Sequence, residues 1–133
     1  MQMPRLILLV EDSEQCASNL EIALSTLPGV EVIWAPSGRE ALHVLDTTVE
    51  RRISAVVTDL DMPDVDGFEL VKAVRTHSRY AGLPIIVVSG NTDPELGRRL
   101  QALGADAFLS KPYSPGEVRN KLEQYLYGRL KRD

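Results

Sequence analysis

Five short apolar segments recur along the chain, and between them apolar residues follow a helical spacing. Residues 6–10 are continuously apolar, which is typical of a central parallel strand covered by helices on both faces. Four further segments rich in β-branched, aromatic or other apolar residues are predicted strands, at residues 30–35, 55–58, 85–88 and 107–109. The longest apolar run has the length of a buried strand and is far shorter than a membrane span.

Helices are predicted between the strands from their apolar spacing and from their start signals. Helical spacing is seen in three groups: Cys16, Leu20, Ala23 and Leu27; Phe68, Val71 and Val74; and Leu96, Leu100 and Leu103 before Gly104. Capping boxes, in which a hydroxyl and a glutamate three residues later satisfy free backbone N–H groups, are predicted for Ser37 with Glu40, Thr92 with Glu95 and Ser114 with Glu117.

The order of the elements predicts an α/β fold. Five strands alternate with five helices through short loops, which implies a doubly wound parallel sheet with helices on both faces. No linker, low-complexity tract or second repeat interrupts the 133 residues. We therefore predict one domain over residues 1–133, with its core at about residues 5–127.

Composition excludes some classes of partner and favours one compartment. The net charge is −4 and no basic stripe is present, so direct binding to nucleic acid is not expected. No signal-peptide pattern or membrane-spanning run is found, so no membrane association is expected. The single cysteine, Cys16, cannot form an internal disulfide, which suits a reducing cytoplasm. We expect a cytoplasmic protein in which Cys16 is a small buried hydrophobe.

Residues able to perform chemistry follow four of the five predicted strands. They are Glu11 and Asp12 after the first strand, Asp59 and Asp61 after the third, Ser89 after the fourth and Lys111 after the fifth. The carboxyl ends of parallel strands meet at one edge of the sheet, where such folds bind their ligands. We therefore expect these side chains to converge on one site.

The residue types in this group indicate phosphoryl chemistry. Clustered carboxylates repel one another, and a divalent cation such as Mg²⁺ relieves the repulsion by binding oxygen ligands. The Ser89 hydroxyl and the Lys111 ammonium are donors suited to phosphate oxygens. Taken singly, Ser89 would be a turn residue and Lys111 a solvated loop residue. Together the group indicates a carboxylate nucleophile, a metal ion and a phosphate clamp.

The motifs that contain these residues resemble the receiver domain of two-component response regulators from residue 5 to about residue 127. The most specific motif is Asp-Leu-Asp-Met-Pro-Asp-Val-Asp-Gly at residues 59–67. The others are Val-Glu-Asp at residues 10–12, Val-Ser-Gly at residues 88–90 and Leu-Ser-Lys-Pro at residues 109–112. The resemblance implies a flavodoxin-like sheet of five parallel strands in the order 2-1-3-4-5.

The resemblance also implies how phosphate and metal are bound. Asp59 would accept a phosphoryl group from the phosphohistidine of a histidine kinase or a phosphotransfer protein. Asp12, Asp59 and the backbone carbonyl of Asp61 would bind Mg²⁺ directly, and Glu11 would act through water. Such a domain is a signalling module that catalyses only its own phosphorylation and dephosphorylation. It occurs as a stand-alone regulator and as part of hybrid kinases or longer regulators.

A conformational switch is part of the same implication. Ser89 and Lys111 would hold the phosphoryl oxygens, and Ser89 and Phe108 would move together. The surface made by the fourth helix, the last strand and the fifth helix, with Tyr113 at its edge, would then bind an effector or a second copy. The Lys111–Pro112 peptide bond is expected to be cis.

Two other functions are compatible with parts of the pattern. Residues 56–61 also resemble the opening motif of haloacid-dehalogenase-type phosphatases, in which Asp59 would be phosphorylated and Asp61 would act as acid or base. That motif usually lies on the first strand of a longer chain, and turnover of a generic phosphate ester distinguishes the two. The second alternative is a degenerate receiver that only binds partners, which the complete set of site residues argues against.

Overall fold

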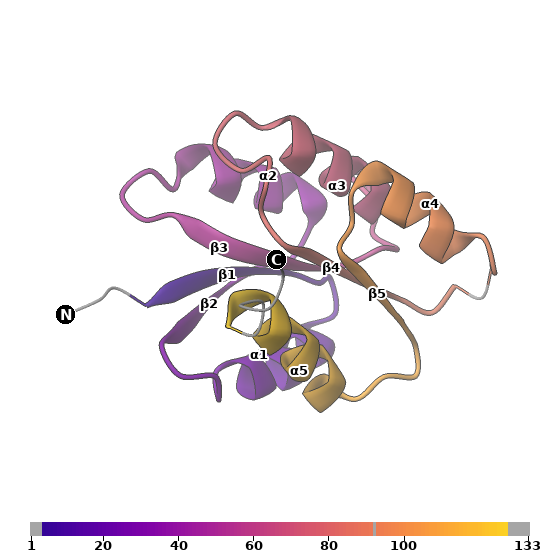
Figure 1. Ribbon diagram of the computed structural model, residues 1–133, viewed down its shortest axis with the longest axis horizontal. Helices are drawn as coiled ribbons and strands as arrows, with labels where there is room; N and C mark the ends of the chain where they lie inside the picture. The colour runs from indigo at the N-terminus through magenta and orange to yellow at the C-terminus, as the bar shows by residue number, and fades with distance from the viewer. Residues whose placement is uncertain (1–3, 92, 128–133) are drawn as a thin grey trace.

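Five parallel strands form the centre of the molecule in the computed structural model, which describes residues 4–91 and 93–127 (Figure 1). The strands are β1 (Arg5–Val10), β2 (Val30–Ala35), β3 (Ile53–Asp59), β4 (Ile85–Ser89) and β5 (Ala107–Ser110). They lie in the order β2-β1-β3-β4-β5, and every neighbouring pair is parallel. The predicted topology is therefore confirmed.

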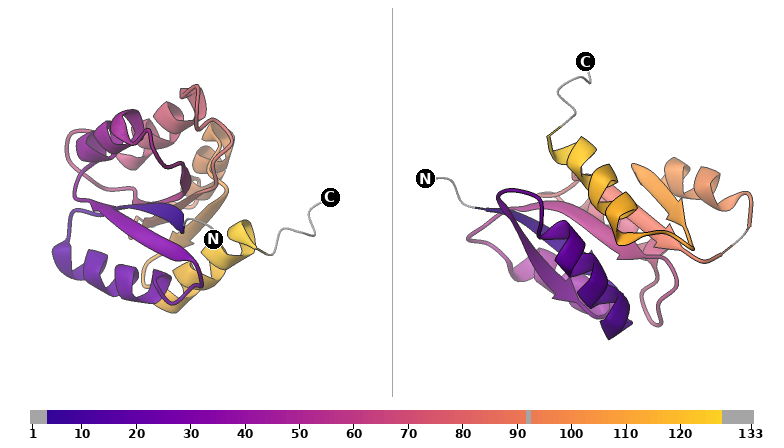
Figure 2. Two further views of the ribbon diagram at one scale, coloured as in Figure 1. Left: turned by 90° about the vertical axis from the view of Figure 1, so that its left-hand side faces the viewer. Right: turned by 90° about the horizontal axis from the view of Figure 1, so that it is seen from below.

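Helices cover both faces of the sheet, as the alternating pattern predicts. They are α1 (Glu14–Leu24), α2 (Gly38–Thr47), α3 (Gly67–Thr76), α4 (Leu96–Leu103) and α5 (Pro115–Leu126). Figures 1 and 2 show α1 and α5 packed on one face and α2, α3 and α4 on the other. None of these described helices is both long and apolar enough to cross a membrane.

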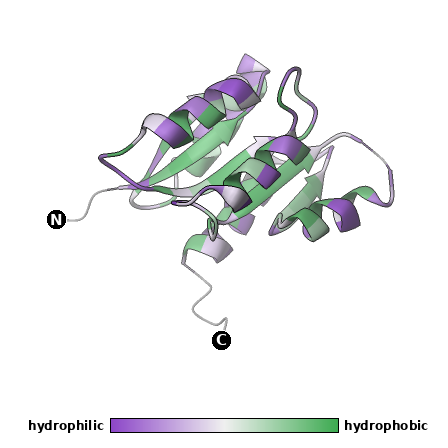
Figure 3. Cartoon of the chain, turned by 90° about the horizontal axis from the view of Figure 1, so that it is seen from above, coloured by the Kyte–Doolittle hydropathy of each residue, from purple (hydrophilic) through white to green (hydrophobic). Residues whose placement is uncertain are grey.

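The core consists of two apolar layers divided by the sheet. Successive residues of a strand point to opposite faces, so Leu6, Leu8 and Val10 pack on the side of α2–α4. Ile7 and Leu9 pack on the side of α1 and α5. All five are buried, and the strands are the most hydrophobic part of the molecule in Figure 3. The continuous apolar run of β1 is thus explained by burial on both faces.

Two predicted helix starts are confirmed by their hydrogen bonds. At α5, the Ser114 hydroxyl accepts a bond from the Glu117 N–H at 3.2 Å, and the Glu117 carboxylate accepts one from the Ser114 N–H at 2.8 Å. At α2, the Ser37 hydroxyl accepts a bond from the Glu40 N–H at 3.1 Å. These bonds satisfy N–H groups that have no partner within the helix.

The predicted start of α4 is wrong. Thr92 lies outside the described residues, but the helix begins at Leu96, and Glu95 at the N-cap position makes no side-chain capping bond. Instead, the Asp93 side chain accepts a hydrogen bond from the Glu95 N–H at 2.9 Å. Such local bonds from aspartate compete with helix formation, so the chain enters α4 three residues later than predicted.

The loop between β3 and α3 is closed at its base by a glycine. The Gly67 N–H donates to the Leu60 carbonyl at 2.9 Å, and a Cβ at this position would lie 2.7 Å from the Leu60 Cα. Asp66 and Glu69 form a further capping box, which we did not predict, at the start of α3. Glycine is therefore required where the loop that follows Asp59 returns to the sheet.

We predict that Gly67→Ala lowers the free energy of unfolding by about 1–3 kcal/mol, the usual range for overpacking. The methyl group would press on the backbone of Leu60, which cannot turn away as a side chain can. Urea denaturation measures the effect. Gly82→Ala is the matched control, because a Cβ there meets nothing within 4 Å. Equal urea midpoints for the two variants would contradict the prediction.

Candidate functional site

Three acids meet at the carboxyl ends of β1 and β3, which are neighbouring inner strands of the sheet. Glu11 and Asp12 directly follow β1, and Asp59 is the last residue of β3. In the β1–β3 ladder Val10 lies opposite Thr58, so the residues that follow emerge side by side. One carboxylate oxygen from each of the three acids lies within 4.8 Å of the others. The predicted convergence of these acids is therefore observed.

Two of these acids are almost completely withdrawn from water. Glu11 is 1% exposed and Asp59 is 4% exposed, whereas Asp12 is exposed. Burial is the main cause that raises the pKa of Glu11 to about 7, and the neighbouring Asp59 charge adds to it. Burial also raises the pKa of Asp59, while the Lys111 ammonium opposes this shift. The site therefore holds more negative charge than its surroundings stabilise.

The donor atoms of this group fit a hard divalent cation. Among the described residues, Oε1 of Glu11 is a buried side-chain oxygen with no hydrogen-bond partner. An unpartnered buried carboxylate oxygen is costly, and a cation beside it removes that cost. All ligand atoms offered by Glu11, Asp12 and Asp59 are oxygens, which are the ligands that Mg²⁺ prefers.

Asp61 and Ser89 are joined by a hydrogen bond beside the acidic group. Ser89 is 0% exposed at the end of β4, and its hydroxyl donates to Oδ2 of Asp61 at 2.9 Å. The same hydroxyl accepts a bond from the Asn91 N–H at 3.0 Å. The Asp61 N–H also lies 3.4 Å from Oδ1 of Asp59, to which it donates. Asp61 thus contacts both the predicted phosphoacceptor and the predicted switch residue.

Lys111 reaches the site from the end of β5. Its backbone N–H donates to the Ser89 carbonyl at 2.7 Å, which ties the β5–α5 loop to β4. Its ammonium is close enough to lower the pKa of both Asp59 and Glu11 against the effect of burial. The Lys111–Pro112 peptide bond is cis, as predicted. The structure therefore brings this lysine to the acids, as the strand-end argument requires.

Phe108 lies on the same face of the sheet as Ser89. Phe108 pairs with Val87 across the β4–β5 ladder, and Ser89 follows Val87 by two residues, so both side chains point the same way. Phe108 is half-buried and packs against the core on the side of α2–α4. It lines a surface pocket of about 360 Å³ together with Gly97 and Leu100 of α4. A residue that changes place here would alter the α4–β5 surface.

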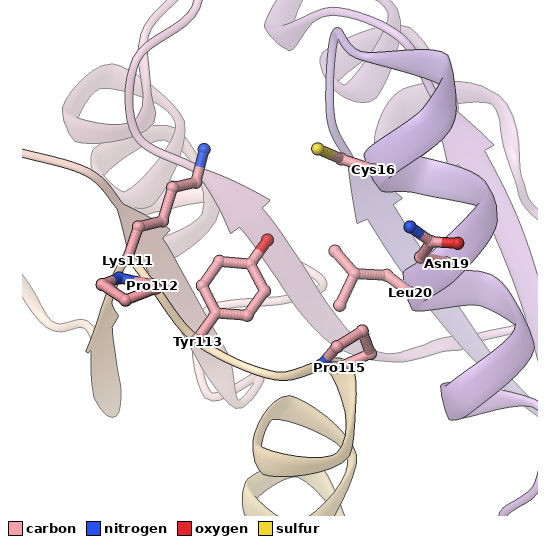
Figure 4. A pocket seen from close by; sticks show the side chains of 7 residues that line it. All are labelled: Cys16, Asn19, Leu20, Lys111, Pro112, Tyr113 and Pro115. Carbon is pink, nitrogen blue, oxygen red and sulfur yellow. The ribbon is translucent and has the colours of Figure 1, made fainter.

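Tyr113 lies in the loop between β5 and α5, two of the three elements of the predicted binding surface. Its side chain packs with the core on the side of α1 and α5, because the chain crosses the sheet edge before α5. Tyr113 and Lys111 face Cys16 and Leu20 of α1 across a pocket of about 380 Å³ (Figure 4). Burial, with a smaller effect of the Glu11 charge, raises the pKa of Tyr113 to about 12.

One residue that supports the site gave no sequence signal. The indole N–H of Trp34 on β2 donates to the backbone carbonyl of Glu11 at 2.8 Å. Trp34 pairs with Leu9 in the β1–β2 ladder, so its side chain is next to the chain that leaves β1. The bond fixes the backbone that presents Glu11 and Asp12, and it follows from strand pairing rather than from any local motif.

We predict that the metal-free protein loses stability as the pH rises from about 4.5 to about 7, and that this dependence levels off above about 7. Glu11 has its pKa raised from 4.5 to about 7 in the folded state, so the folded protein holds a proton that the unfolded chain releases over this range. Urea denaturation in the presence of chelator measures the slope. The variant Glu11→Gln should flatten it, and an unchanged slope in that variant would contradict the assignment.

Comparison with known proteins gives the family. The family described as "Response regulator receiver domain" matches residues 7–123. Chemotaxis protein CheY1 of Helicobacter pylori is 33% identical over 122 residues, which cover 90% of this chain and 95% of CheY1. The transcriptional regulatory protein GltR of Pseudomonas aeruginosa is 36% identical over 123 residues, which cover 92% of this chain and 49% of GltR.

A solved structure supports the same assignment. The chemotaxis response regulator CheY4 of Vibrio cholerae superposes with a TM-score of 0.81 at 34% sequence identity, and the alignment covers 93% of this chain and 100% of that chain. The strand order, the acidic group at the ends of β1 and β3 and the sequence match agree with one another. The chain belongs to the response regulator receiver domain family, the phosphoacceptor modules of two-component signalling.

Proposed function

We propose that Asp59 is the residue that accepts the phosphoryl group, from the phosphohistidine of a histidine kinase or of a phosphotransfer protein. A carboxylate oxygen of Asp59 would bond to phosphorus while the bond from phosphorus to the donor nitrogen breaks, and the nitrogen would keep the electron pair. The observation that carries this proposal is the position of Asp59, a buried carboxylate at the end of β3 with Glu11 and Asp12 beside it.

The acidic group is proposed to bind Mg²⁺. Asp12, Asp59 and the backbone carbonyl of Asp61 would be direct ligands, and Glu11 would act through water. Bound there, the cation would neutralise charge on the carboxylates and on the phosphoryl oxygens. The unpartnered Oε1 of Glu11 and the oxygen-only donor set support this part of the proposal.

Ser89 and Lys111 are proposed to hold the phosphoryl oxygens and to transmit the change. The Lys111 ammonium would pair with one oxygen, and the Ser89 hydroxyl would turn toward another. Phe108, on the same face of the sheet, would occupy the space that Ser89 leaves. The face made by α4, β5 and α5 would then bind a downstream effector or a second copy of the chain.

The wider setting is part of the same proposal. The domain, with its core at residues 5–127, would catalyse only its own phosphorylation and dephosphorylation, in the cytoplasm, where Cys16 stays reduced. The match spans nearly all of CheY1 but about half of GltR. The output of this chain is therefore proposed only as a change in protein contacts.

We predict that a small acyl phosphate with Mg²⁺ adds one phosphoryl group to the protein and that Asp59→Asn abolishes the labelling, because the amide is a far weaker nucleophile than the carboxylate. Mass spectrometry of the intact protein measures the added group. Asp64→Asn is the matched control, since Asp64 is an exposed acid of the same loop. Undiminished labelling of Asp59→Asn would show that another residue accepts the phosphate.

We predict that Mg²⁺ changes the fluorescence of Trp34, the only tryptophan of the chain, and that chelator abolishes phosphorylation. The reason is the bond between the Trp34 N–H and the Glu11 carbonyl, which joins the indole to the metal-binding segment. Asp12→Ala should weaken the fluorescence-detected affinity by at least about tenfold.

Glu31→Ala serves as the control for this titration, because Glu31 is an acid of β2 that pairs with Arg51 and lies outside the acidic group. Full labelling in excess chelator, or equal Mg²⁺ affinities for Asp12→Ala and Glu31→Ala, would count against the proposed metal site.

A further inference from the structure

The hydroxyl of Ser89 already makes two hydrogen bonds in the unphosphorylated protein. It is fully buried, it donates to Oδ2 of Asp61 at 2.9 Å, and it accepts from the Asn91 N–H at 3.0 Å. A serine hydroxyl carries a single proton and can donate only one full hydrogen bond at a time. Any bond from Ser89 to a phosphoryl oxygen must therefore replace the bond to Asp61.

The two competing acceptors are of similar chemistry. A carboxylate and a phosphoryl group both accept charge-assisted hydrogen bonds, which are stronger than bonds between neutral groups. Asp61 lies two residues after Asp59, and its N–H donates to Oδ1 of Asp59. The Asp61 carboxylate, which competes with phosphate for the Ser89 hydroxyl, thus lies in the loop that follows the phosphoacceptor. It already accepts the hydrogen bond from Ser89 in the absence of phosphate.

We propose that Asp61 is a positioning residue whose carboxylate holds the Ser89 hydroxyl in the unphosphorylated arrangement and so opposes the switch. This proposal rests on the proposed function of Asp59 and Ser89. A ligand shifts an equilibrium only by its preference for one state over the other. The phosphoryl group must therefore accept a stronger hydrogen bond from Ser89 than Asp61 does. Loss of the Asp61 carboxylate lowers the free energy that the phosphoryl group must supply to shift the equilibrium.

Asp61 would also lower the affinity for a phosphate mimic by electrostatic repulsion. This effect has to be separated from the effect of the hydrogen bond to Ser89. The Asp61 carboxylate repels an anionic phosphate mimic, so its removal raises affinity for the mimic even without any contact to Ser89. Repulsion acts whether or not residue 89 carries a hydroxyl. The hold on Ser89 exists only when the hydroxyl is present, and a double-mutant cycle therefore separates the two effects.

The experiment measures the affinity for beryllofluoride, in the presence of Mg²⁺, of the native protein, Asp61→Ala, Ser89→Ala and the double variant. Asp61→Ala should raise affinity in both backgrounds, and the gain should be at least about threefold larger when Ser89 is present. Equal gains in the two backgrounds would overturn the proposal and leave the proposed function intact. Failure of the native protein to bind beryllofluoride would instead contradict the proposed function.

A measurement without any phosphate mimic decides the proposal independently. The Asn91 N–H donates to the Ser89 hydroxyl, so its protection from hydrogen exchange reports where Ser89 points. Exchange of this amide should become faster in Asp61→Ala and stay unchanged in Asp64→Asn, the control acid of the same loop. An unchanged exchange rate in Asp61→Ala would show that Asp61 does not hold Ser89.

Discussion

Buried negative charge that the Lys111 ammonium compensates only in part is the constraint on which the rest of this structure depends. The inner strands β1 and β3 are covered by apolar side chains on both faces, and the acids Glu11 and Asp59 at their ends are almost as buried as the strands themselves. The raised pKa values of Glu11 and Asp59 express the cost of this arrangement. A core that was built for stability alone would not place carboxylates there, and such local conflicts are typical of functional sites.

The sheet brings residues from four strands close to the buried acids. The ends of β1, β3, β4 and β5 lie along one edge, so a group bound at Asp59 is close to Asp61, Ser89 and Lys111 at once. Ser89 and Phe108 then share one face of two paired strands. Under the proposed function, a change in hydrogen bonding at Ser89 would reach the α4–β5 surface through Phe108, which lies on the same face of the sheet.

The sequence predicted the features that depend on local periodicity and on the geometry of parallel sheets. The apolar run of β1 and the acids that follow it are adjacent in the chain, and their convergence with Asp59 follows because parallel strands end at one edge. The prediction of where α4 begins was wrong because the Asp93 side chain competes locally with helix formation. The Asp66 capping box was readable from its spacing with Glu69 and was overlooked.

The contacts that sequence could not predict depend on strand pairing and on side-chain rotamers. The bond from Trp34 to Glu11 requires β2 to pair with β1 in one particular register. The bond from Ser89 to Asp61 requires one rotamer of each side chain.

The match over residues 7–123 supports the receiver over the phosphatase alternative, in which Asp61 would act on substrate rather than hold a serine.

The acids at the strand ends and the helical surfaces proposed to bind partners are formed by different parts of the molecule. Residues that surround Asp59 come from strand ends and are fixed by the sheet, whereas Phe108 and Tyr113 lead to opposite faces of it. Either face can change in sequence without moving the carboxylates, because the strands and not the helices position them. The match spans CheY1 almost entirely and about half of GltR, so similar sequences occur in relatives of different length. Under the proposed function, specificity for a partner would reside on the helical faces, and the strength of the switch would reside in the hydrogen bond between Ser89 at the end of β4 and Asp61 in the loop that follows β3.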